Sequence, residues 1–197
     1  METVREGLGL LLRGLDRTVK LVTSFKQVAV DQTAERRRCF DLKEVIEGVV
    51  ALMQTTLKST PYRVELQIAP GIEMDSYPGP VEQIIANLIN NSVFHGFNGR
   101  DHGVIRIVAE SEGGLIKVVY SDDGLGMSED VQRHIFDPFF TTRLGSGGSG
   151  LGMSICYNLV TGPLGGALSV ISELDKGCEF TLILPDKAPI REENKPK

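Results

Sequence analysis

Five glycines fall within eight residues between Gly145 and Gly152, and an apolar run from Met153 to Val160 follows directly. Glycine loses the most conformational entropy on folding, so such a cluster marks a backbone that bends unusually or approaches another group closely. A loop that opens a helix directs free N–H groups and the positive end of the helix dipole toward its ligand, which favours phosphate. The stretch therefore predicts a loop that covers phosphate groups.

Two common glycine motifs do not account for this loop. Gly145, Gly147 and Gly150 match G-x-G-x-x-G, but no buried strand precedes them and no βαβαβ unit follows. A P-loop would need Lys and Ser or Thr directly after Gly150, where Leu151 and Gly152 stand. A flexible surface linker is the remaining alternative, and the helix-forming residues that follow without a break disfavour it.

Asn87 and Asn91 lie four residues apart in a segment that otherwise reads as an apolar helix. Residues at this spacing share one helix face, and amides are poor residues for a helix interior. The pair indicates a polar cleft in which a carbonyl oxygen could ligate Mg²⁺. Asparagines that simply point to water are an equally good interpretation of this pair alone.

A second polar stretch, Asp122 to Gly126, reads DDGLG and follows an alternating strand. A carboxylate there can accept a hydrogen bond from an exocyclic amine, which would select adenine over guanine. A plain acidic turn is the alternative, and the other ligands of a calcium loop are missing. Aromatic residues and a cation follow in Phe136 to Arg143, where a hydrophobic lid packed on the core is the alternative.

Composition limits the class of protein. The chain has 197 residues, a formal net charge of −5 and no basic block, which disfavours nucleic acid as a partner. Its three cysteines are widely spaced, which excludes a disulfide framework or a C-x-x-C zinc site and suits a reducing compartment. The leucine-rich start contains charged residues, so no signal peptide or membrane span is predicted and a cytoplasmic location is expected.

The N-terminal segment predicts a helix over residues 5–30. Its apolar positions step by four and three residues, the spacing of a narrow coiled-coil seam: Leu8, Leu12, Leu15, Val19 and Val22. A helix packed on its own domain is the alternative to this dimer or bundle helix. Residues 31–38 are polar and charge-dense, and residues 35–38 read as a connector.

From Cys39 onward, helices and paired strands interleave. Helices are predicted over residues 41–57, 81–94, 128–135 and 153–160, and strands over 62–68, 72–74, 103–109, 115–120, 166–171 and 179–184. The charged stretch from Asp186 is expected to be a disordered tail. This order favours an α+β fold in which helices cover one face of a sheet.

Five motifs in order make the chain similar to one known family. It resembles the catalytic ATP-binding domain of sensor histidine kinases, in the gyrase–Hsp90–histidine kinase–MutL superfamily. The resemblance covers roughly residues 40–185 and implies a Bergerat-type two-layer α/β sandwich with a mixed sheet, preceded by the N-terminal helix. The motifs are NLINN (Asn87–Asn91), DDGLG (Asp122–Gly126), FDPFFTTR (Phe136–Arg143), GSGLG (Gly148–Gly152) and GCEFTLILP (Gly177–Pro185).

The resemblance implies ATP and Mg²⁺ as cofactors and gives roles to single residues. Asn91 would coordinate the Mg²⁺ that bridges the phosphates, with Asn87 beside it. Asp122 would accept from the adenine N6 amine, with support from Thr181 through water. The two glycines of DDGLG, Gly124 and Gly126, would let the base and the sugar approach.

The glycine loop and its surroundings would bind the phosphates. Gly148, Gly150, Leu151 and Gly152 would contribute backbone contacts beneath a lid. His95 would lie near the phosphates, and Thr142 and Arg143 would lie in the lid, where Arg143 counts with Asn87 and Asn91 as a catalytic residue. Phe94 stands where the family often has lysine, so one phosphate contact is in doubt.

Asn87 separates a kinase from an ATP hydrolase. The superfamily's hydrolases carry a glutamate general base at this position, and an amide cannot take a proton at neutral pH. The resemblance therefore implies phosphoryl transfer to histidine rather than hydrolysis. The alternatives are a gyrase-type or Hsp90-type ATPase and a non-catalytic nucleotide-binding module that acts through its N-terminal helix.

The acceptor histidine is expected outside this chain, because His95, His102 and His134 all lie beyond the N-terminal helix. Residues 1–35 are predicted to be the second helix of a dimerisation hairpin with its connector, residues 36–185 the catalytic domain and residues 186–197 a disordered tail. The implied partners are the histidine-bearing helix of the parent kinase, a response regulator and a second copy in a homodimer.

Overall fold

The computed structural model describes residues 36–58, 60–142 and 149–190. The helix predicted over residues 5–30 lies outside the described residues. So do Arg143, Gly145, Gly147 and Gly148 of the predicted lid.

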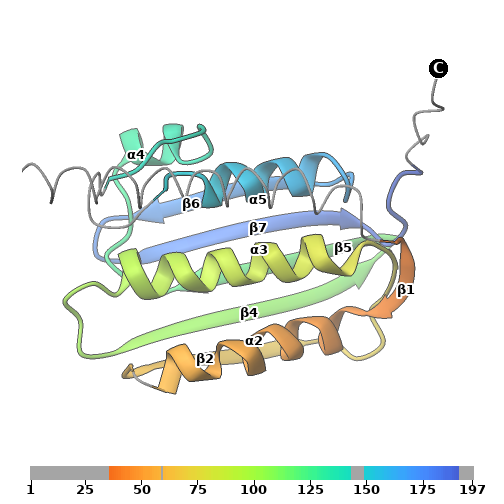
Figure 1. Cartoon of the computed structure of the whole chain (residues 1–197), viewed down its shortest axis with the longest axis horizontal. Helices are drawn as coiled ribbons and strands as arrows, with labels where there is room; N and C mark the ends of the chain where they lie inside the picture. The colour runs from red at the N-terminus through yellow and green to blue at the C-terminus, as the bar shows by residue number, and fades with distance from the viewer. Residues whose placement is uncertain (1–35, 59, 143–148, 191–197) are drawn as a thin grey trace, which may run out of the picture.

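A mixed five-stranded sheet forms one layer of the domain (Figure 1). In spatial order its strands are β2 (Tyr62–Ile68), β4 (Gly103–Glu112), β5 (Leu115–Asp122), β7 (Gly177–Pro185) and β6 (Ala167–Glu173). β2 pairs with β4 in parallel, and every other neighbouring pair is antiparallel. The mixed sheet implied by the resemblance is confirmed.

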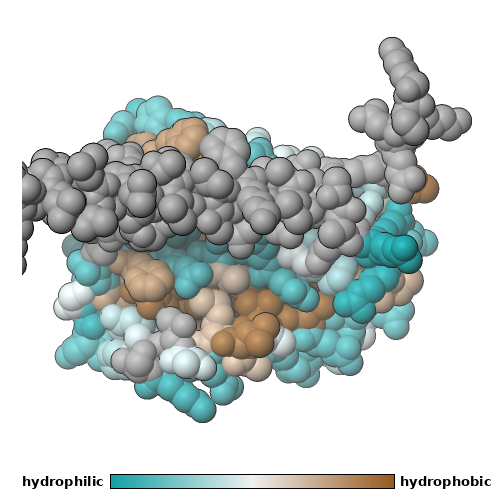
Figure 2. Space-filling model, viewed as in Figure 1, coloured by the Kyte–Doolittle hydropathy of each residue, from teal (hydrophilic) through white to brown (hydrophobic). Residues whose placement is uncertain are grey.

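Among the described residues, helices form the second layer and cover one face of this sheet (Figure 1). They are α2 (Leu42–Lys58), α3 (Pro78–Asn91) and α5 (Gly152–Thr161), and a short helix, α4 (Glu129–His134), packs near β6. Figure 2 shows hydrophobic residues gathered around α2 and α3 on this face. The two-layer α/β sandwich is therefore the observed architecture.

Local sequence signals explain where the helices begin and which side they bury. Asp41 caps α2, because its Oδ1 accepts from the Lys43 amide at 2.7 Å and the Glu44 amide at 3.3 Å. Ser128 caps α4 by accepting from the Val131 amide at 3.4 Å. α3 begins at Pro78, and the apolar residues that it buries include Ile84, Ile85, Leu88 and Ile89.

A second, two-stranded sheet corrects the sequence reading. The strand predicted over residues 72–74 as a return after Gly71 is β3 (Glu73–Ser76), and it pairs with β1 (Arg38–Asp41) instead of β2. Part of the expected disordered tail is also ordered beside β3. The Asp186 carbonyl oxygen accepts from the Asp75 amide at 2.8 Å, and the Ala188 amide donates to the Asp75 carbonyl oxygen at 3.0 Å. The expectation of disorder from Asp186 is therefore wrong for residues 186–190.

Candidate functional site

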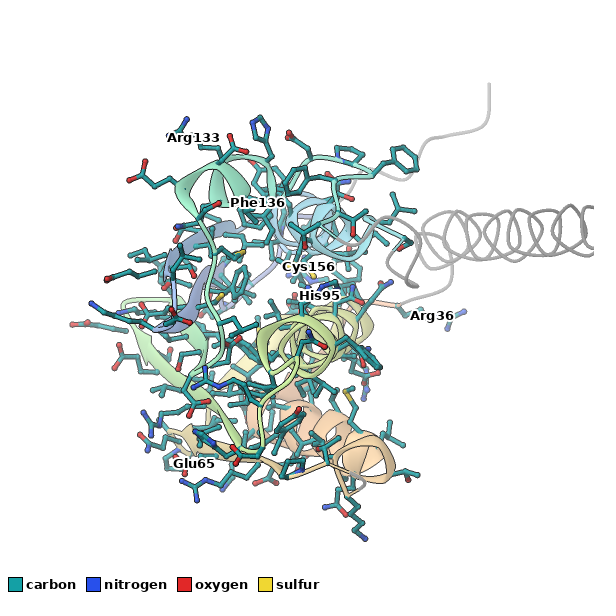
Figure 3. The ribbon with its side chains drawn as sticks, turned by 90° about the vertical axis from the view of Figure 1, so that its left-hand side faces the viewer. Arg36, Glu65, His95, Arg133, Phe136 and Cys156 are labelled. Atoms are coloured by element: carbon teal, nitrogen blue, oxygen red, sulfur yellow. The ribbon has the colours of Figure 1, made fainter. Side chains whose placement is uncertain are left out.

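The ends of three elements that carry predicted site residues meet at one edge of the sandwich, which faces the viewer in Figure 3. α3 ends there at Asn91, β5 ends there at Asp122, and α5 begins there at Gly152. Contacts between α3 and α5 and a hydrogen bond from Ser92 to Asp122 hold these ends together. The sheet and the two helices thus bring together residues up to 65 positions apart in sequence.

Asp122 is a buried carboxylate, with 8% of its surface exposed. Its Oδ2 accepts from the Ser92 hydroxyl at 2.6 Å, and its Oδ1 accepts from the Gly124 amide at 3.0 Å. Burial raises the pKa of Asp122, and these two hydrogen bonds oppose that rise. Each carboxylate oxygen has two lone pairs, so Asp122 can accept a further hydrogen bond from a ligand amine.

The two glycines of DDGLG are required by the packing of the chain on itself. A Cβ at Gly124 would lie 2.6 Å from the Gly96 carbonyl oxygen, and the Leu125 amide donates to that same oxygen at 2.8 Å. A Cβ at Gly126 would overlap the carbonyl oxygen of Glu173. This close approach keeps the loop after Asp122 against the turn that follows α3.

Asn87 and Asn91 share one face of α3, as predicted, but differ in their surroundings. The Asn87 Nδ2 donates to the Gly152 carbonyl oxygen at 3.4 Å. Asn91 is half-buried, and its side chain makes no hydrogen bond to another described residue. The Asn91 oxygen can therefore serve as a ligand, whereas Asn87 is held by α5.

A π-helical turn, η1 (Ser92–Gly96), follows α3 at this edge. The predicted helix end at residue 94 falls inside this turn. Such turns interrupt α-helices and are frequent at functional sites. His95 lies in η1 and is labelled in Figure 3, while Phe94 is 57% exposed.

The residues on either side of the undescribed lid segment contact each other. A Cβ at Gly150, which has a φ of 67°, would lie 2.6 Å from the Phe139 carbonyl carbon. Phe136 packs on Tyr157 of α5 with ring centroids 5.3 Å apart (Figure 3). Leu151 is buried and Thr142 is exposed. The motifs before and after the lid thus form one packed unit at the start of α5.

Thr181 does not lie beside Asp122. In the register of β5 and β7, Asp122 is opposite Cys178, and Thr181 is opposite Val119. Side chains alternate between the faces of a strand, so Thr181 projects from the face opposite to Asp122. Sequence reasoning missed Cys178, although counting back along β7 from the buried Phe180 would have placed it on the same face as Asp122.

The three cysteines are free and differ in access, which gives a testable order of reactivity. Burial raises the pKa of Cys178 to about 11 and the pKa of Cys156 to about 12, whereas Cys39 is exposed. At pH 8 a thiol with a pKa near 11 is thiolate in only about one molecule in a thousand, so we expect a thiol reagent to modify Cys39 alone in the native protein. Mass spectrometry of the labelled chain checks this order.

Cys39→Ser is the control for that measurement and should remove the fast phase of labelling, leaving Cys156 and Cys178 to react only after denaturation. Fast labelling of Cys178 in the native protein would contradict the burial described for it.

A cavity of about 460 Å³ lies on the sheet face that the helices leave uncovered. Arg63, Arg106, Glu173 and Glu179 contribute to its walls, and neither Asn87 nor Asn91 does. Asp122 also lines this cavity, whereas the other predicted site residues that the structure describes do not.

No group of three or more His, Cys, Asp or Glu residues that could hold a metal occurs in the described part of the chain. A Mg²⁺ held by one amide oxygen and by ligand phosphates needs no such group. Within the same residues, no helix is both long and apolar enough to cross a membrane.

The chain is similar to proteins of one known family. Residues 77–188 match the family described as Histidine kinase-, DNA gyrase B-, and HSP90-like ATPase. The chain is 27% identical over 180 residues to Sporulation kinase B of Bacillus subtilis, covering 91% of this chain and 41% of that protein. It is 31% identical over 173 residues to the sensor histidine kinase ZraS of Escherichia coli, covering 86% of this chain and 35% of that protein.

Solved structures share the fold. The catalytic domain of histidine kinase ThkA aligns with a TM-score of 0.68 at 24% identity, covering 77% of this chain and 97% of that chain. The chain spans less than half the length of the two curated relatives named above. With the match over residues 77–188, the chain belongs to the histidine kinase-, DNA gyrase B- and HSP90-like ATPase family and contains the ATP-binding catalytic domain of a sensor histidine kinase.

Proposed function

We propose that this domain transfers the γ-phosphate of ATP to a histidine on a dimerisation helix, within a two-component sensor kinase. One observation carries the proposal. At the same edge of the sandwich, Asp122 presents a buried acceptor for an amine, Asn91 offers an amide oxygen, and Asn87 occupies the position of a general base without being able to act as one.

Adenine recognition is assigned to Asp122. Its carboxylate accepts from the exocyclic amine of adenine, and guanine would place a carbonyl oxygen against this acceptor. The two hydrogen bonds from Ser92 and Gly124 hold the acceptor in place before the ligand arrives. Burial of Asp122 strengthens such a hydrogen bond because water competes less for it.

Phosphate binding is assigned to Asn91 and the start of α5. The Asn91 oxygen fits Mg²⁺, because it is a hard ligand and makes no hydrogen bond among the described residues. Bound Mg²⁺ would neutralise charge on the phosphates. The first amides of α5, from Gly152 onward, begin a helix and favour anions, while the Leu151 amide just before them donates to Ser149 Oγ at 3.3 Å. Roles for His95, Thr142, Arg143, Gly148 and Gly150 stay predictions.

Asn87 supports transfer over hydrolysis. Its neutral amide donates to α5 and cannot take a proton from water. Catalysis then depends on positioning and on electrostatic stabilisation of the transferred group, as in other phosphoryl transfers. The site would hold ATP intact until an acceptor histidine arrives.

The partners follow from this chemistry. The chain has three histidines, from His95 onward, and none lies in the predicted N-terminal helix. The acceptor is therefore assigned to a histidine-bearing helix of the parent kinase. A response regulator would receive the phosphate next, and the ThkA structure in complex with the response regulator TrrA, which aligns with a TM-score of 0.69, supports this type of partner. We also propose a homodimer through residues 1–35 and, from the free cysteines, a cytoplasmic location.

The experiment is a transfer assay with γ-labelled ATP, the full chain and a purified cognate dimerisation domain. We expect Mg²⁺-dependent ADP binding by calorimetry, acid-labile label on the supplied domain and none on this chain. The same reaction in EDTA is the control. Label on this chain alone would overturn the account of the acceptor, and nucleotide binding without any transfer would support a regulatory module instead.

A further inference from the structure

Ser92, Tyr120 and Asp122 form a buried hydrogen-bonded chain between η1 and β5. The Ser92 hydroxyl lies 2.6 Å from Asp122 Oδ2 and 2.8 Å from the Tyr120 hydroxyl. Tyr120 is 0% exposed and Ser92 is 2% exposed. These groups are therefore shielded from water and satisfy one another.

The direction of this chain follows from the number of protons. An ionised carboxylate only accepts, so the single Ser92 hydroxyl proton must point to Asp122. Ser92 must then accept from Tyr120, whose hydroxyl keeps its proton because complete burial raises its pKa well above the ordinary value. The hydrogen bonds run from Tyr120 through Ser92 to Asp122.

This chain fixes the plane of the Asp122 carboxylate. Oδ2 is held by Ser92 and Oδ1 by the Gly124 amide, so rotation of the carboxylate breaks at least one of these hydrogen bonds. The far end of the chain is fixed as well, because the Tyr120 ring packs edge-on against Phe180 with centroids 6.4 Å apart. The free lone pairs of Asp122 are thereby aimed in one direction.

We propose that Ser92 and Tyr120 are positioning residues that set the base selectivity of the site, by orienting the Asp122 carboxylate toward the exocyclic amine of a purine. This inference rests on the proposed function, in which Asp122 receives adenine. It assigns the preference for an amine over a carbonyl to two residues that touch neither the base nor the phosphates.

Base selectivity separates this role from a purely structural one. Inosine diphosphate carries a carbonyl where ADP carries the amine, so at that position it offers Asp122 an acceptor and no donor. Loss of carboxylate orientation should therefore weaken ADP binding and leave inosine diphosphate binding nearly unchanged. General damage to the fold would weaken the binding of both nucleotides together.

The test measures both affinities by calorimetry for the full chain and its Ser92→Ala and Tyr120→Phe variants. We expect Ser92→Ala to weaken ADP binding about tenfold and Tyr120→Phe about threefold, with inosine diphosphate changed less than about twofold. Ser92→Thr keeps the hydroxyl and should restore the preference for ADP. Ser76→Ala is the matched control, because Ser76 is buried and its hydroxyl has no hydrogen-bond partner among the described residues.

Two results would overturn the proposal. An unchanged ratio of ADP to inosine diphosphate affinity in both Ser92→Ala and Tyr120→Phe would leave these residues a structural role only. Should Ser92→Ala fail to fold, Tyr120→Phe, which keeps its ring, decides alone by the same ratio. A native chain that binds neither nucleotide would instead reject the proposed function, and this inference with it.

Discussion

Asp122→Asn is expected to weaken ADP binding by about 10-fold to 100-fold, the equivalent of one lost hydrogen bond to a charged group. The native carboxylate accepts from Ser92 on one oxygen and from the Gly124 amide on the other. An amide has only one oxygen, so in either orientation its NH₂ group faces one of these donors. The variant can neither keep both internal hydrogen bonds nor present the same acceptor to adenine.

Calorimetry with ADP and Mg²⁺ measures this effect. Asp123→Asn is the matched control, because Asp123 is the next residue and is exposed. Its Oδ1 accepts from the Val104 amide of β4 at 2.8 Å. We expect its ADP affinity to stay within about twofold of the native value, since an amide oxygen can replace this single acceptor. Equal losses in the two variants would show that Asp122 has no specific role.

Gly177→Ala is expected to lower the free energy of unfolding by about 2–5 kcal/mol, through an unfavourable φ and a backbone clash combined. Gly177 has a φ of 85°, a conformation that side chains disfavour. Its added Cβ would overlap the carbonyl oxygen of Asp122 and lie 3.0 Å from the Asp123 Cα. β5 and β7 are paired beside Gly177. The clash could therefore be relieved only if the two strands separated at the edge of the sheet that carries Asp122.

Urea unfolding followed by circular dichroism measures this loss, and Gly71→Ala isolates its causes. Gly71 has a similar φ of 72°, but nothing lies within 4 Å of its added Cβ. The control should therefore cost only about 1–2 kcal/mol, the contribution of the φ alone. If the two variants lost equal stability, the clash with Asp122 would have no energetic effect.

The two-layer architecture could be predicted from the sequence because it depends on local signals. Alternating apolar residues gave the five strands of the sheet, and caps such as Asp41 and Ser128 marked where helices begin. The pairing of β1 with β3 could not be read in this way. Both are four-residue strands, too short to show a period, and their partners lie more than 30 positions apart.

The motifs of the candidate site could be predicted from the sequence, but the register of the strands that carry them could not. Asp122 and Asn91 are carried by short patterns and lie at the same edge. The register of β5 and β7 was not visible in the sequence, and it puts Cys178 opposite Asp122 and Thr181 on the other face. The role of Ser92 could not be predicted, because a serine next to an asparagine forms no recognisable pattern. The role appears only in the fold, which brings the Ser92 hydroxyl to 2.6 Å from Asp122 Oδ2.

Asp75 joins both ends of the domain at one point. Arg37 donates to both of its carboxylate oxygens, at 2.8 and 2.7 Å, and the backbone of Asp75 bonds Asp186 and Ala188. In Figure 1, β1 and the last described residues lie at the end of the sheet away from α4. A mechanical force applied between residues 37 and 188 would thus be borne by this junction and would bypass the five-stranded sheet.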